Sequence, residues 1–146
     1  MTSYTNTGLS TNTTYYYRVV AYNLGGSSAA SNIASGTTTN TLTAVHVGGV
    51  YGFRTGTKTA WYGNITVTVV NGSNLPVQGV TVTVTYGSST RTGVTGSNGQ
   101  VTLTTAKLKS NNASVTMTVT NLTGTGFSYT SSLNTPNPPS VTLYRP

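Results

Sequence analysis

The sequence predicts an all-β protein made of β-sandwich domains in tandem, the first of them incomplete. Thr, Ser, Asn and Gly dominate the 146 residues, and Val and Tyr supply most of the apolar mass. Val, Thr and Tyr favour strands because branched and aromatic side chains pack well on a pleated surface. Apolar and polar residues alternate in most segments, and no run of ten or more residues has helical apolar spacing. Composition and periodicity therefore agree on strands throughout.

Residues 1–39 are predicted to form only the last strands of a sandwich. In "TYYYRVVAYN", residues 15, 17, 19 and 21 share one strand face and residues 16, 18, 20 and 22 share the other. "NLGG" (23–26) signals a turn, and "SNIASGTT" follows as a weak final strand. Two or three strands cannot bury a core alone. We expect the missing strands to come from an upstream segment of a longer chain or from another subunit that completes the open edge.

Residues 40–44 are predicted to be a linker, and residues 45–146 a second and complete sandwich. Val80, Val82 and Val84 alternate with threonines, and this one-sided stripe is what a sandwich of two sheets requires. "ASVTMTVTNL" repeats the scheme with Val115, Met117 and Val119. The strands are expected at 44–50, 61–71, 79–86, 90–95, 100–106, 113–121 and 140–144.

The first segment resembles the C-terminal part of a fibronectin type III domain over residues 4–38. "GLSTNTTYYYRVVAYN" matches the family pattern at Leu9, Thr13, Tyr15 and Val19. The resemblance implies that Tyr15 is a tyrosine-corner residue, whose hydroxyl bonds to backbone a few residues upstream. The chain departs from the family in lacking its first four strands.

The second segment resembles bacterial immunoglobulin-like domains of the invasin and carboxypeptidase-regulatory-like kind. The resemblance rests on "NGSNLPVQGVTVTVTY" followed by "GVTGSNGQVTLT". The matching positions are Pro76, Val77, Gly79, Val80, Val82, Thr95, Gly99 and Val101. Gly96 stands where the family has Asp. Together the two resemblances imply tandem immunoglobulin-like sandwiches.

The composition argues against an enzyme. The chain contains no Asp, Glu or Cys, and His46 is its one histidine. Hydrolysis by paired carboxylates, thiol chemistry and a complete Ser-His-Asp triad are therefore excluded. The same shortage of ligands leaves no zinc or calcium site, so we expect no metal and no cofactor. His46 in "AVHVGG" is predicted to be a strand residue at the edge of the sandwich.

The formal net charge of +7 does not predict nucleic-acid binding. Phosphate tracking requires a stripe of cations, but here only Lys107 and Lys109 are close in the sequence. The seven cations are Arg18, Arg54, Lys58, Arg91, Lys107, Lys109 and Arg145. No apolar run has membrane-spanning length. We therefore expect no nucleic-acid partner and no membrane insertion.

Exposed tyrosines are the candidates for contact with a glycan or a protein partner. Tyr16 and Tyr22 are six residues apart on one predicted strand face and would form a platform. Tyr62 follows Trp61, so the two point to opposite faces, and Trp61 is predicted to be the core residue of the pair. Asn98-Gly99 predicts a β-turn and a hairpin. Candidate N-glycosylation sequons occur at Asn12, Asn64, Asn71, Asn112 and Asn121.

The leading hypothesis is a non-catalytic structural module of an extracellular or cell-surface fibre that self-associates through its β-sandwiches. One alternative is a C-terminal accessory region of a secreted bacterial hydrolase, which spaces the enzyme or binds polysaccharide. A second alternative is a surface adhesin. The incomplete first domain favours the fibre, because head-to-tail sharing of strands that does not close on itself gives a filament.

Overall fold

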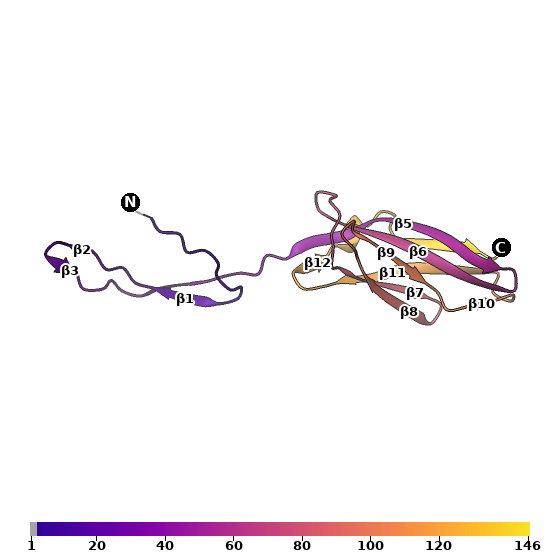
Figure 1. Cartoon of the computed structure of the whole chain (residues 1–146), viewed down its shortest axis with the longest axis horizontal. Coiled ribbons are helices and arrows are strands. Elements are labelled where there is room, and N and C mark those ends of the chain that lie inside the picture. Colours follow the sequence, from indigo (N-terminus) through magenta and orange to yellow (C-terminus); the bar gives the residue numbers. More distant parts are fainter. Residues whose placement is uncertain (1–2) are drawn as a thin grey trace. The chain divides into compact units, whose positions relative to one another are not determined.

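The computed structural model describes residues 3–146, which divide into two compact units (Figure 1). Unit 1 ends at Thr41 and unit 2 is Leu42–Pro146, so the division lies inside the stretch expected to be a linker. Within residues 3–146 every regular element is a β-strand, apart from the short 3-10 helix η1 (Ser131–Leu133). The predicted all-β fold class is confirmed. Among these described residues, no helix is long and apolar enough to span a bilayer.

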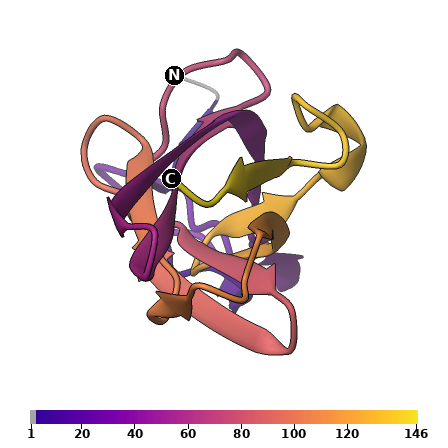
Figure 2. The ribbon, with the colours of Figure 1, turned by 90° about the vertical axis from the view of Figure 1, so that its right-hand side faces the viewer.

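Unit 2 is a sandwich of two sheets, which enclose one interior in the end-on view (Figure 2). In the β5 sheet the strand order is β10-β6-β5-β12, and β9 also pairs with β6. In the β11 sheet the order is β13-β11-β7-β8. The strands are β5 (Thr43–Thr57), β6 (Ala60–Asn71), β7 (Thr81–Tyr86), β8 (Ser89–Val94), β9 (Gln100–Thr104), β10 (Leu108–Lys109), β11 (Ser114–Thr123), β12 (Phe127–Tyr129) and β13 (Ser140–Tyr144).

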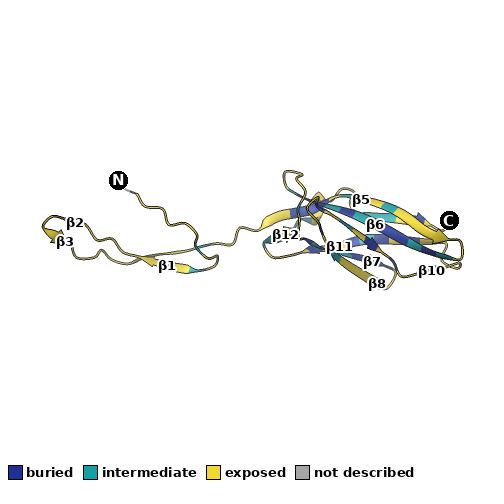
Figure 3. Cartoon of the chain, viewed as in Figure 1, coloured by how far each residue is buried: buried dark blue, intermediate teal, exposed yellow. Residues whose placement is uncertain are grey.

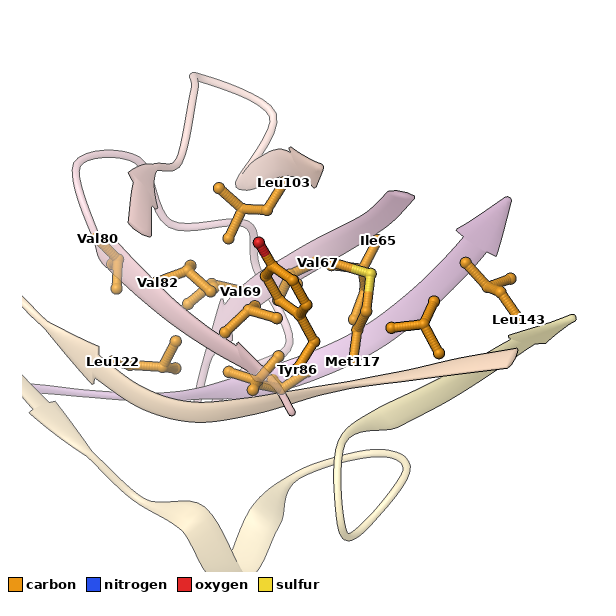
Figure 4. Packing of buried hydrophobic residues seen from close by; sticks show 14 of the residues in the cluster. Ile65, Val67, Val69, Val80, Val82, Tyr86, Leu103, Met117, Leu122 and Leu143 are labelled. Carbon is orange, nitrogen blue, oxygen red and sulfur yellow. The ribbon is translucent and has the colours of Figure 1, made fainter. Parts of the chain in front are cut away.

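The core of unit 2 consists of the inward-facing residues of both sheets (Figure 4). Ile65, Val67 and Val69 project from β6 toward Val82 of β7 and Met117 of β11, and all five side chains are fully buried. The threonines between the valines of β7 are half-buried on the outer face. The predicted valine stripes therefore form the core, as their alternation indicates.

The first strand of unit 2 is longer than the sequence predicts. β5 was expected at 44–50 but continues to Thr57, and it pairs with β6 from Val45 to Thr57 with a register shift between Val47 and Gly49. Gly52 explains why an apparent strand breaker lies inside it, because a Cβ there would come within 2.4 Å of Val141 Cγ2. Glycine permits this close approach of β5 to β13. In the sequence alone, the glycines of this segment indicate that the strand has ended.

Two further predictions about unit 2 need correction. β10 and β12 were not expected, and β12 pairs in parallel with β5, a contact between segments some eighty positions apart that no local pattern indicates. The β-turn at Asn98-Gly99 is present, with Gly99 at φ +72°. Its flanking strands do not form a hairpin ladder, however, because β8 belongs to the β11 sheet and β9 to the β5 sheet.

Unit 1 contains two small two-stranded sheets, and its long predicted strand is interrupted. β1 (Thr14–Tyr17) pairs with β4 (Ala34–Thr37), and β2 (Tyr22–Asn23) pairs with β3 (Gly26–Ser27). Between β1 and β2, side-chain hydroxyls replace backbone acceptors: Val19 N donates to Ser31 Oγ and Ala21 N donates to Ser28 Oγ. Such side chain-to-backbone bonds compete with a regular ladder, so residues 14–23 do not form one continuous strand.

No residue of unit 1 from residue 3 onward is buried, whereas unit 2 contains the whole core (Figure 3). Within residues 3–41 only Leu9, Thr13, Tyr15 and Thr38 are even half-buried. Two two-stranded sheets therefore present their side chains to solvent on both faces. Neither face of these sheets is covered within the described part of unit 1.

Candidate binding surfaces

Titratable side chains are the usual components of catalytic and metal sites, and His46 is the one histidine of the chain. His46 lies in β5 opposite Val70 and is 6% exposed, so it is a covered strand residue inside unit 2 and not an accessible base. In the part of the chain that the structure describes, no three His, Cys, Asp or Glu side chains gather where they could hold a metal ion. The candidate binding sites described below are therefore surfaces formed by neutral side chains.

One surface of unit 1 is apolar and partly framed by the segment before β1. The register places Tyr15 opposite Gly36 and Tyr17 opposite Ala34, so two tyrosines face small residues on one side of the sheet. Ser10 N donates a hydrogen bond of 3.0 Å to the Tyr15 hydroxyl, which is the upstream backbone bond expected of this tyrosine. Asn6 Nδ2 donates to the Tyr17 hydroxyl at 3.2 Å.

We call this surface the Tyr15 face. Its residues are Leu9, Tyr15, Tyr17, Val19, Ala34 and Gly36. A groove of about 550 Å³ runs along it between Tyr17 and Val19 of the hairpin and the preceding segment around Tyr4 and Leu9. Val19 is 71% exposed and Tyr17 39% exposed. The opposite face carries Thr14, Thr37, Tyr16 and Ser35, so the sheet is apolar on one side only.

The structure does not bring Tyr16 and Tyr22 together on one platform. Tyr16 lies in β1 and Tyr22 in β2, and the interruption at 18–21 separates the two strands. Tyr16 borders a hollow with Arg18 and Ile33, whereas Tyr22 borders a different hollow formed by residues 21–28. Both side chains are strongly exposed. The expectation of a shared strand face assumed an unbroken strand and is wrong for this pair.

Trp61 and Tyr62 lie as predicted. Trp61 is fully buried in the core, and Tyr62 is half-buried on the other side of β6. The register adds two aromatic residues that the sequence analysis missed on this outer face, since Tyr51 pairs with Thr66 and Phe53 with Asn64. The available signal was the spacing of two in "YGF", which the neighbouring glycines obscured. Tyr62 is therefore the one predicted contact residue that has aromatic neighbours in unit 2.

The five sequons differ in accessibility. Asn64 is 6% exposed, its Nδ2 donates to the Phe53 carbonyl, and its Oδ1 accepts from Thr104 Oγ1. A glycan on Asn64 is incompatible with this buried amide, so we remove Asn64 from the candidate modification sites. Asn71 is half-buried, and its Oδ1 accepts from Ser73 N and Leu75 N. Asn12, Asn112 and Asn121 are exposed.

Comparison with protein-family models, with curated proteins and with solved structures finds no match to this chain. The fibronectin type III and immunoglobulin-like resemblances therefore rest on the matching residues alone. The function must be argued from the two units and their surfaces.

Proposed function

We propose that this chain is a non-catalytic structural module of an extracellular or cell-surface fibre, in which a neighbouring copy completes the sandwich of unit 1. The observation that carries the proposal is the Tyr15 face. It is an apolar sheet face in a segment whose described residues bury nothing. A two-stranded sheet is marginal in water on its own, and apolar area that is covered on association provides the driving force for assembly.

The backbone of unit 1 supports the same proposal. Within the described residues, β1 and β4 pair only with each other, so each strand has one edge open to a further strand. Open edges are templates for strand addition from another chain. A strand or hairpin from a neighbouring copy would satisfy this edge and cover Tyr17 and Val19 at the same time.

The division into two units favours a filament over a closed dimer. Unit 2 has its own closed core, and unit 1 requires a partner. When a surface of one copy binds a different surface of the next copy, the contacts repeat, and they give an open filament if the rotation does not close. Such a role needs no catalytic group, and the chain has neither carboxylates nor thiols. The resemblance to modules of secreted proteins and the exposed sequons support an extracellular location for the proposed fibre.

Sedimentation velocity and negative-stain microscopy of the full chain, from low to high micromolar concentration, test the proposal. We expect concentration-dependent growth into linear assemblies. We also expect hydrogen exchange of the amides of β1 and β4 to slow on assembly, because backbone groups that pair between chains are protected. The fluorescence of Trp61, the one tryptophan of the chain, reports separately that unit 2 is folded.

A matched pair of variants assigns the contact to the Tyr15 face. The double substitution Tyr17→Ser and Val19→Ser should abolish assembly, because it removes apolar area from that face. Tyr16→Ser lies on the opposite face of the same strand and should leave assembly intact. A chain that stays monomeric at every concentration, with fast exchange in unit 1, contradicts the fibre and favours the accessory-region alternative, in which other segments of a longer polypeptide supply the missing sheet.

A further inference from the structure

The outer face of the β5 sheet carries three aromatic residues in adjacent positions. Tyr51 and Phe53 are two apart on β5, and Phe53 and Tyr62 are diagonal neighbours across the β5-β6 pair. The intervening glycine identifies which side this is, because a Cβ on Gly52 would meet Val141 and Leu143 of the β11 sheet. Tyr51, Phe53 and Tyr62 therefore point away from the core. Diagonal cross-strand positions are within reach of aromatic side chains.

The aromatic rings are ordered relative to each other and accessible. The Tyr51 and Phe53 rings are stacked, with centroids 6.1 Å apart and planes at 26°. Tyr51 is 69% exposed and Phe53 is 37% exposed. Both stand on the middle of a long two-stranded ladder that also pairs with β9, so the backbone beneath them is held on a sheet and not on a loop. Exposed aromatic residues that are adjacent on a rigid element are typical of binding surfaces.

Neutral polar groups lie beside the rings in fixed positions. The hydroxyls of Thr66 and Thr102 are 2.8 Å apart, in the cross-strand row that begins with Tyr51. In the next row Thr104 Oγ1 donates to Asn64 Oδ1 at 2.7 Å. A hydroxyl both donates and accepts hydrogen bonds, so Thr66, Thr102 and Thr104 can each bond to a ligand in addition to the partner that each has in the sheet.

We propose that this face, which we call the Tyr51 face, binds a neutral polysaccharide. Its residues are Tyr51, Phe53, Thr55, Tyr62, Thr66, Thr102 and Thr104. The π-face of an aromatic ring is electronegative and attracts the weakly positive C–H groups of a sugar ring that lies flat on it. The rows of hydroxyls beside the rings match the hydroxyls at the edge of the sugar. A stacked pair followed by a third aromatic residue fits a chain of several sugar units better than it fits one isolated sugar.

The charge of the face selects a neutral partner. None of its side chains is a cation or an anion, although the chain as a whole has a formal charge of +7. Arg54 follows Phe53 but lies opposite Gly63, whose added Cβ would meet core side chains, so Arg54 is on the other side of β5. A single-stranded nucleic acid would also stack on aromatic rings, but it requires cations along its phosphates, and the Tyr51 face has none.

This proposal is independent of the fibre, because it uses residues of unit 2 only. Affinity electrophoresis of the full chain in native gels that contain mannan, xylan, hydroxyethyl cellulose or soluble starch tests it. We expect at least one of these polysaccharides to retard the protein. Tyr51→Ala and Phe53→Ala should each raise the apparent dissociation constant roughly fivefold, as expected for the loss of one stacking ring. Phe53→Tyr keeps the ring and should retain binding.

Tyr144→Ala is the matched control, because Tyr144 is 65% exposed on β13 of the other sheet, and its retardation should equal that of the unchanged chain. Should Phe53→Ala not fold, Tyr51→Ala alone decides the question. Failure of all four polysaccharides to retard the protein overturns the proposal. A loss of retardation in Tyr144→Ala equal to that in Tyr51→Ala also overturns it. So does salt-sensitive binding of a single-stranded oligonucleotide, if Tyr51→Ala weakens that binding. A further outcome overturns the proposal: no polysaccharide binds, and sedimentation shows that Tyr51→Ala reduces self-association. The Tyr51 face would then be an interface between copies.

Discussion

The two units are built from the same residue types and differ in what those residues bury. Val19 in unit 1 and Val67 in unit 2 both belong to alternating apolar stripes, yet Val19 is 71% exposed and Val67 is fully buried. Alternation creates a strand with one apolar face. Burial additionally requires a second sheet, and unit 2 has one whereas the described part of unit 1 does not. A strand pattern therefore predicts which face is apolar, but not whether that face is covered within the chain.

Two tyrosines show the same contrast at the level of one hydrogen bond. The Tyr15 hydroxyl accepts from Ser10 N, and the Tyr86 hydroxyl accepts from Ala106 N at 2.9 Å. The Tyr86 ring is 7% exposed, and the Arg91 guanidinium lies 5.7 Å from its centroid. The Tyr15 ring is only half-buried. A bond from a backbone amide to a tyrosine hydroxyl forms in both units, but only in unit 2 does the tyrosine ring belong to a packed core.

The largest expected effect is the loss of stability when an apolar side chain is truncated, which should be large in unit 2 and absent in unit 1. Ile65→Ala in the core of unit 2 should lower the free energy of unfolding by about 3 kcal/mol, because it loses the transfer free energy and leaves a cavity. Val19→Ala in unit 1 should leave that free energy unchanged in the monomeric chain. Urea unfolding followed by the fluorescence of Trp61 measures unit 2 in both variants. A clear loss in Val19→Ala would mean that Val19 is covered by unit 2, and the contrast between the units would fail.

A buried threonine in unit 2 gives the next largest effect. Thr95 is 3% exposed, accepts from Val80 N at 3.0 Å and donates to the Val77 carbonyl at 2.7 Å. Thr95→Val keeps the shape but leaves the buried Val80 amide and the partly buried Val77 carbonyl unpaired, and we expect a loss of about 2 kcal/mol by urea unfolding. Thr85→Val on the outer face of β7 is the control and should change stability by less than about 0.5 kcal/mol. Equal effects at the two positions would show that the buried bonds are not what stabilises the start of β7.

The parts of the structure that could be predicted are those that depend on local pattern. Seven of the strands of unit 2 and the inward valine stripes follow from alternation between turn signals, and the burial of Trp61 follows from the tendency of sandwich domains to enclose a tryptophan between their sheets. The second half of β5 could not be predicted in this way. Gly52 is unfavourable in an isolated strand and becomes favourable only when β13 packs against it. The parallel pairing of β12 with β5 also depends on chain folding over a long distance.

The candidate surfaces were harder to predict for the same reason. The platform of Tyr16 and Tyr22 assumed a regular strand, but the side-chain oxygens of Ser28 and Ser31 accept hydrogen bonds from backbone amides in place of backbone carbonyls. The Tyr51 face appears only when β5, β6 and β9 are placed side by side, since its rows of residues come from three separate segments. Sequence alternation identified Tyr62 but could not show which aromatic residues stand next to it.

The smallest expected effect tests whether assembly makes the two units alike. Tyr86→Phe removes the acceptor of a partly buried bond and should lower the free energy of unfolding of unit 2 by about 1 kcal/mol. Tyr15→Phe removes the corresponding acceptor in unit 1, where the bond is exposed to water, and should have no measurable effect on the monomeric chain. In the assembled state the Ser10 amide should exchange slowly, and Tyr15→Phe should restore fast exchange, because a bond that a second sheet shields from water is harder to open. Hydrogen exchange at Ser10 that is equally fast before and after assembly would show that the partner does not cover the Tyr15 face, and the two units would then differ in the fibre as they do in the free chain.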